Sequence, residues 1–207
     1  MKKLVLAATV VTISVLAWTI QQPAPAAMQM HHAHATGAPV SYAELKDTVA
    51  ILDRARKATE KYQDVRIAQE DGYQAIGPDV PGMGIHFVHT NQHSPAFDAE
   101  HPPILLYESN ASVPGGYSLV GVSYLLAAPE GPDGQPLNAP LPKSLAAWHR
   151  HENICVLPDR STSTQLTEKQ CREQNGRFSP ETPWMVHAWI WKESPLGVFS
   201  PTNPAVR

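Results

Sequence analysis

Histidine is frequent in this chain, with 10 among 207 residues. Two of the histidines stand two positions apart in the segment LAAWHRHENIC, residues 145–155. If this segment is an extended strand, His149 and His151 point to the same face, because side chains alternate along a strand. Two imidazoles on one face could hold one metal ion, whereas in a solvated loop they would be ordinary polar side chains. The chemistry of the pair therefore depends on what other strands bring to it.

Further candidate ligands occur in other apolar segments. His86 lies in GMGIHFVH, His187 in PWMVHAWIW, and Glu108 ends the apolar run ILLYE. Each histidine alone is compatible with a hydrogen-bonded structural residue, and Glu108 with a strand end that faces water. Together they match the imidazole and carboxylate shell of mononuclear transition-metal sites. We expect a shell of His86, His149, His187 and Glu108, with His151 as the competitor for one place.

The surroundings of His187 predict a pocket wall. By strand parity Met185, His187 and Trp189 share one face, where an unpaired imidazole would be costly to bury. Trp148, Met185 and Trp189 are therefore expected to line the site. Core packing is the alternative role for the tryptophans. His93 and His101 lie in a polar stretch and are expected in a loop.

Three functions follow from this set of residues. The leading hypothesis is a protein that binds one transition-metal ion, with zinc or copper favoured, for metal handling or metal-dependent chemistry. The second is a metal-dependent enzyme, a hydrolase or oxygenase, that activates water or oxygen in a pocket lined by tryptophan and methionine. The third is a non-catalytic module that binds a small-molecule ligand and in which the histidines are structural.

The N-terminus indicates export. Lys2 and Lys3 precede an uncharged, mostly apolar run at 4–20, and Ala24-Pro25-Ala26 resembles a signal peptidase site. We expect residues 1–26 to be a signal peptide and the mature protein to be secreted or periplasmic, with an uncleaved anchor as the alternative. Residues 27–40 read as a flexible leader that contains three histidines. The net charge of −3, without a basic run, predicts no nucleic-acid partner, and after signal cleavage we expect no membrane association.

The remaining residues, 41–207, predict a single α+β domain. Ser41 and Glu44 form a capping-box pattern, and apolar residues then recur at helical spacing. They are Leu45, Val49, Leu52, Ala55, Ala58, Tyr62 and Val65. One helix, or two in sequence, should therefore cover about 42–71 and bury this stripe. Short apolar runs between turn residues follow at 85–89, 104–108, 119–127, 145–151 and 183–191. They predict a compact, mainly antiparallel β-domain, either a small sandwich or a barrel, on which the amphipathic helix packs.

Cys155 and Cys171 are the two cysteines of the chain. In an exported protein such a pair most simply forms a disulfide, which here would close a polar loop and contribute on the order of 3 kcal/mol. The alternative is that both thiolates bind metal, although the pair lacks CxxC spacing.

Segments throughout the chain resemble an uncharacterised family of exported bacterial proteins. The resemblance lies in GMGxHF, LLYE, WHxHxNIC and WMxHxW, followed by Pro-x-Gly-x-Phe and Asn-Pro. It covers the chain from the first helix to the terminal Asn-Pro, and it implies secretion and a shared fold without implying an activity. The His-x-His pair also invites comparison with cupins. Their motif places a glutamate four residues after the second histidine, where this chain has Cys155.

Overall fold

A computed structural model describes residues 30–32, 39–91 and 97–207. The expected signal peptide and most of the expected leader lie outside these residues. From the leader, Met30–His32 forms strand β1 and pairs with β6, so that the backbone of His32 lies opposite that of His149. No helix in the described ranges is long and apolar enough to cross a membrane.

The helical region begins at the expected capping box. The Glu44 backbone N–H donates to the Ser41 hydroxyl, and the Ser41 N–H donates to the Glu44 carboxylate. These bonds satisfy backbone donors that have no partner within the helix. Helix α1, Tyr42–Thr59, continues into the 3₁₀ turn η1, Glu60–Gln63, and the short helix α2, Val65–Glu70, follows. The predicted helical range of 42–71 is confirmed.

The predicted buried stripe is wrong for the first half of α1. Leu45 and Val49 are about half exposed, whereas Thr48, Ala55 and Thr59 are buried. The buried face is thus rotated from the apolar stripe and includes threonines. Both threonine hydroxyls donate to the backbone carbonyl four residues earlier, so burying them leaves no unmet donor.

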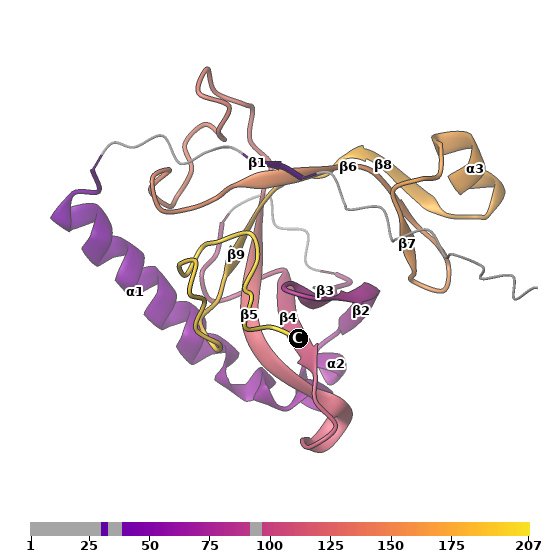
Figure 1. Ribbon diagram of the computed structural model, residues 1–207, viewed down its shortest axis with the longest axis horizontal. Helices are drawn as coiled ribbons and strands as arrows, with labels where there is room; N and C mark the ends of the chain where they lie inside the picture. Colours follow the sequence, from indigo (N-terminus) through magenta and orange to yellow (C-terminus); the bar gives the residue numbers. More distant parts are fainter. Residues whose placement is uncertain (1–29, 33–38, 92–96) are drawn as a thin grey trace, which may run out of the picture.

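An antiparallel sheet follows the helices. Its order is β1-β6-β9-β5-β4-β3-β2, and β7 and β8 also pair with β6 (Figure 1). The strands after the helices are β2 Tyr73–Val80, β3 Gly84–His89, β4 Ile104–Ser109, β5 Tyr117–Leu126, β6 His149–Val156, β7 Thr162–Ser163, β8 Arg177–Glu181 and β9 Trp184–Ala188. A 3₁₀ turn, η2 Pro114–Gly116, precedes β5, and helix α3, Glu168–Glu173, lies between β7 and β8.

The two ends of the sheet approach each other. The Gly77 N–H on β2 donates to the Arg160 carbonyl just before β7, at 2.9 Å, and the Arg160 guanidinium donates to the Gln74 side chain at 3.0 Å. The eight strands that follow the 22-residue helix therefore form a nearly closed barrel, which confirms the predicted α+β fold. The sequence patterns predicted β3, β4, β5 and β9 but missed β2, β7 and β8, and also β1, which lies in the expected flexible leader. Strand β6 begins at His149 instead of residue 145.

The sheet separates two groups of buried apolar residues. The larger group, which we call the helix-side core, joins Ala55, Tyr62 and Val65 of the helices to alternate strand residues such as Tyr107 and Val186. The smaller group lies on the alternating positions: Ile104, Leu106, Val120, Met185, Trp189 and Val206. We call this second side the histidine face, because His187 alternates with Val186 on β9 and follows Met185 by two residues.

The C-terminal segment is tied to the start of β3. The Gly82 N–H donates to the Val206 carbonyl at 3.1 Å, and the Asn203 N–H donates to the Gly82 carbonyl at 2.8 Å. Gly84 has φ of +70°, and a Cβ there would lie 2.1 Å from the Tyr107 carbonyl oxygen. Only glycine allows the two strands to approach so closely. The GMG segment before His86 is therefore required by the fold.

The expected disulfide joins Cys155 of β6 to Cys171 of α3. Both sulfurs are engaged, so the alternative role of these cysteines as metal thiolates is wrong. The bridge anchors α3 to the sheet within a segment that also contains β7. A Cβ on Gly176 would lie within 3 Å of both sulfurs, so the chain turns tightly around the bridge.

Replacing Gly84 with alanine is expected to destabilise the fold by about 3 kcal/mol or more, because a positive φ and a clash with the backbone act together. Gly134→Ala is the matched control. It has nearly the same φ, +69°, but a Cβ there meets no atom within 4 Å, so it should cost only about 1 kcal/mol. Urea unfolding of both variants measures the difference. Equal losses would mean that the Gly84–Tyr107 approach does not constrain the sheet.

Candidate metal centre

Three strands place four histidines on the histidine face. His187 on β9 is opposite Ser123 of β5, and His86 on β3 is opposite Leu106 of β4. His149 begins β6 opposite Met185 of β9, and His151 follows two residues later. Directly opposed residues on antiparallel strands share a face. The register therefore brings His86, His149 and His187 to one side of the sheet.

The imidazole rings form a connected cluster. The centre of the His187 ring lies 5.1 Å from that of His149 and 5.5 Å from that of His86. The His151 ring lies 5.3 Å from His149. Three imidazoles that bind one ion at about 2.1 Å have ring centres roughly 5 Å apart, because tetrahedral bonds diverge from the metal. The observed ring spacings are close to this value.

The present ring orientations do not form a finished coordination shell. Within the described residues, no three His, Cys, Asp or Glu side chains form a group that could hold an ion as they stand. The rings are close enough, so what a shell would require is rotation of the imidazoles toward a common point.

Two of the histidines are hydrogen-bonded to backbone carbonyls. His187 Nδ1 lies 2.8 Å from the Pro201 carbonyl oxygen, and His149 Nδ1 lies 3.1 Å from that of Ala147. A carbonyl only accepts, so each Nδ1 carries the proton and donates, and each Nε2 carries the lone pair of the neutral ring. This arrangement is common for metal-ligating histidine, whose second nitrogen is usually held by a carbonyl or carboxylate.

Burial keeps the imidazoles of His86 and His187 neutral. His149 and His187 are completely buried, and His151 nearly so. Burial lowers the pKa of His86 from 6.5 to about 4, and repulsion from His149 acts in the same direction. The pKa of His187 is well below 6.5, first through burial and then through His149 and His86, and the Pro201 carbonyl opposes the shift only in part. Neutral imidazole is the form that binds metal.

Glu108 is not available to the cluster as the structure stands. Both of its carboxylate oxygens accept hydrogen bonds from the Lys192 ammonium, at 2.6 and 2.8 Å. The pair is largely shielded, with the Glu108 side chain 15% exposed. The expectation that this carboxylate joins the histidines therefore competes with an ion pair that already satisfies it.

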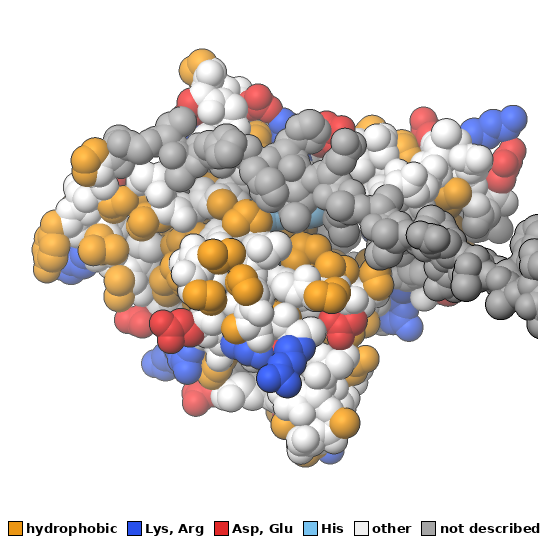
Figure 2. Space-filling view, viewed as in Figure 1, with side chains coloured by type: hydrophobic (Ala, Val, Ile, Leu, Met, Phe, Trp, Pro, Cys, Tyr) orange, Lys and Arg blue, Asp and Glu red, His pale blue; other side chains and the backbone are white. Residues whose placement is uncertain are grey.

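The expected pocket residues divide between the two faces. Met185 and Trp189 lie on the histidine face, where the Trp189 ring is 5.5 Å from that of His187. Trp148 instead packs in the helix-side core, because it precedes His149 by one position and so points to the other face. Figure 2 shows a small patch of histidine surface near the centre of the visible side, among hydrophobic side chains.

Two further histidines of the described residues, His89 and His101, lie apart from this group. His89 stacks edge-on against Tyr73 of the helix-side core, with ring centres 4.9 Å apart. His101 is exposed, and its Nδ1 lies 2.9 Å from the Asp98 carboxylate, as suits the expected loop residue. His93 lies outside the described residues.

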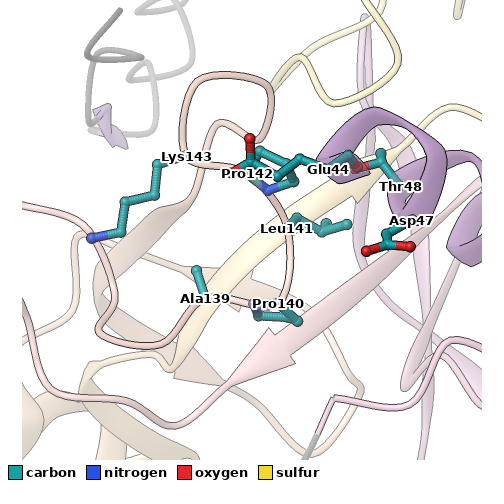
Figure 3. A pocket seen from close by; sticks show the side chains of 8 residues that line it. All are labelled: Glu44, Asp47, Thr48, Ala139, Pro140, Leu141, Pro142 and Lys143. Atoms are coloured by element: carbon teal, nitrogen blue, oxygen red, sulfur yellow. The ribbon is translucent and has the colours of Figure 1, made fainter. Parts of the chain in front are cut away.

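A pocket of about 320 Å³ opens away from the histidine cluster (Figure 3). It lies between α1 and the loop that leads to β6. The residues that line it are Glu44, Asp47, Thr48, Ala139, Pro140, Leu141, Pro142 and Lys143. Glu44 already caps α1, and Lys143 points away from the other side chains toward Asp133, with which it pairs. The pocket gathers no set of groups with a shared chemical role.

Two contributors to the site were missed by the sequence analysis. Ser123 is completely buried beside His187, and a polar residue inside the apolar run LVGVSYLL was a signal that could have identified it. The carbonyl of Pro201, which holds His187, had no such signal. Its role depends on the folding of the C-terminal segment over the sheet, which side-chain types do not reveal.

Comparison with known proteins adds no relative, since no family model, curated protein or solved structure matches this chain.

The metal-free protein should lose stability on mild acidification. The folded pKa values of His86 and His187 are below 6.5, so the unfolded chain binds protons first as the pH falls. This stability is complete above pH 6.5 and is lost as the pH falls toward the folded pKa. For His86, whose folded pKa is about 4, the loss between pH 6.5 and 5 is about 2 kcal/mol. Urea unfolding with a chelator present measures the loss. His86→Asn should reduce it and His101→Asn should not. A stability independent of pH in this window would contradict the burial of neutral rings.

Proposed function

We propose that this is an exported protein that holds one transition-metal ion, zinc or copper, through the imidazoles of His86, His149 and His187. Its role is metal handling or metal-dependent chemistry. The observation that supports this most is the convergence of three histidines from three strands at ring spacings of 5.1 and 5.5 Å. Local sequence alone would not bring these residues together, because His149 lies 63 positions after His86 and His187 lies a further 38 positions along the chain.

The carbonyl-bound Nδ1 atoms also support a metal role. They orient His149 and His187 so that Nε2 is the basic nitrogen of each ring, as a ligand requires. Nε2 of His187 is buried and has no hydrogen-bond partner among the described residues. A buried nitrogen left unpaired costs on the order of 1–3 kcal/mol, and a bound ion would remove that cost.

His151 is the reserve ligand in this proposal. Its ring lies next to that of His149, on the same face of β6. It would bind a fourth position or a second, weaker ion. Export to the periplasm or beyond is part of the proposal and rests on the N-terminal signal pattern and on the disulfide, which suits an oxidising compartment.

The untagged, exported protein is expected to contain close to one metal ion per chain by elemental analysis. After chelation, added zinc or copper(II) should raise the free energy of unfolding, measured in urea. The expected increase is about 2.7 kcal/mol when the free metal is at a hundred times its dissociation constant. His187→Ala and His149→Ala should each weaken binding at least about a hundredfold. Because a buried variant can misfold, half-buried His86→Ala is measured beside them, with circular dichroism to check the fold.

His101→Ala is the control, since that exposed histidine lies outside the cluster and should leave binding unchanged. If the purified protein carries no metal and neither ion changes the unfolding curve, the metal-binding function is wrong. The histidines would then be structural, as in a ligand-binding module.

A further inference from the structure

The first half of β6 is paired on both of its edges. On one edge His149 is opposite Met185 of β9, and on the other it is opposite His32 of β1, which lies along the start of β6 (Figure 1). Strand β1 belongs to the leader, and among the described strands it pairs with β6 alone. This outer edge of β6, at 149–151, is therefore covered by three residues from the segment that precedes α1.

The backbone groups that face β1 can be assigned from the opposite edge of β6. The His151 N–H donates to the hydroxyl of Thr182, between β8 and β9, at 3.0 Å, and the His151 carbonyl accepts from the Thr182 N–H at 2.9 Å. The backbone groups of successive residues point to opposite edges of a strand, so those of Arg150 point to β1. The register places His31 opposite Arg150, and these two residues therefore exchange both backbone hydrogen bonds.

The receiving edge is held in place by contacts within the domain. The Arg150 guanidinium donates to the Glu181 carboxylate of β8 at 2.8 Å and also to the carboxylate of Glu130. Its central carbon lies 4.1 Å from the centre of the Trp184 ring. Further along β6, the disulfide ties the strand to α3. The edge is thus preformed, and a strand that pairs with it does not have to order it first.

Strand β1, by contrast, is attached through a short pairing. Its three residues are fewer than the roughly five to six of a common strand. They also precede the capping box that begins α1, so leaving the edge of β6 breaks neither the helix nor the rest of the sheet. A strand edge without a neighbour offers N–H and C=O groups with which another extended segment can pair. The occupant of this edge is therefore exchangeable.

We propose that the β6 edge at 149–151 is a strand-addition site, filled here by the leader of the same chain and open to the same segment of a second copy. The occupant is an extended peptide whose backbone exchanges two hydrogen bonds with Arg150. The leader is the favoured occupant, because its own pairing shows that Met30–His32 fits the edge in register. Strand addition uses backbone groups and does not depend on metal binding.

The probe is a fluorescein-labelled peptide of residues 27–38, which represents the leader of a second copy. It is titrated into the exported protein with a chelator present, and binding is measured by fluorescence anisotropy. The tethered leader competes at an effective concentration on the order of 1 mM, so wild type should bind the peptide weakly. His31→Pro in the protein removes the N–H that the Arg150 carbonyl accepts. This variant should bind the peptide at least about tenfold more tightly, since its edge is open more often.

His32→Pro in the protein is the matched control. By alternation the His32 N–H points away from β6, so proline there removes no bond to the edge, and the peptide affinity should stay close to that of wild type. Circular dichroism checks that both variants keep the wild-type fold. The same His31→Pro change made in the peptide should abolish its binding to every protein, and comparing the two peptides on wild type needs no protein variant.

Backbone amide exchange locates the contact. In the His31→Pro protein the natural peptide should slow exchange of the Arg150 amide, and should leave the His151 amide, which faces Thr182, unchanged. If the natural peptide binds no better than the His31→Pro peptide, the strand-addition site is wrong. Binding without protection of the Arg150 amide would place the peptide elsewhere and would equally contradict the site. The metal-binding function stands in either case, because every measurement is made on metal-free protein.

Discussion

The burial of uncharged imidazoles on one face of the sheet is the constraint around which this structure is arranged. An imidazolium would be severely penalised there, so the fold holds His86 and His187 in their neutral forms. The C-terminal segment supplies the cover. It contributes the Pro201 carbonyl to His187 and the Ser200 carbonyl to the Trp189 indole, and it places Val206 in the apolar group beside them. The histidine face is therefore closed by residues distant in sequence from β3.

The C-terminal segment that covers the histidine face is held by the glycines at the start of β3. Backbone bonds join Gly82 to Asn203 and Val206, and the missing side chain of Gly84 lets the strand approach Tyr107. His86 follows two residues later, so its position is determined by this close approach. The GMG segment and His86 thus act as one structural unit: the glycines determine the position of β3, and this position places His86. That relation explains why the segment contains both.

Strand parity made much of the site predictable. Alternation along β9 assigned Met185, His187 and Trp189 to one face, and alternation along β6 paired His149 with His151, and both assignments are confirmed. The same rule applied to Trp148 would have placed it on the other face, where it lies. The capping box and the disulfide were predictable because each depends on a few residues of specific chemistry.

Other features depended on packing that a local pattern does not carry. Strand β2 contains Gly77 and Pro78 and lacks a clean alternation, and its edge approaches β7 through backbone groups. In α1 the apolar stripe suggested burial of Leu45 and Val49. The helix contacts the core mainly through its second half. The buried Thr48 and Thr59 donate their hydroxyls to backbone carbonyls of the same helix, so polar residues occupy the buried face at little cost. The spacing of apolar residues shows which face of a helix can pack. How much of that face is buried depends on the sheet that the helix covers.

Lys192 contacts both the Glu108 carboxylate and the C-terminal segment that covers the histidine face. Its ammonium holds the Glu108 carboxylate, and its carbonyl accepts a hydrogen bond from the side chain of Asn203, which is buried in the C-terminal segment. Lys192 therefore engages the Glu108 carboxylate and also helps to fix the segment that holds His187. Because Glu108 is paired with Lys192, it gives the histidine cluster no net negative charge with which to attract a cation. Its affinity for an ion would come from the lone pairs of neutral imidazoles, which favours borderline metals such as zinc and copper over the hard, oxygen-seeking calcium and magnesium.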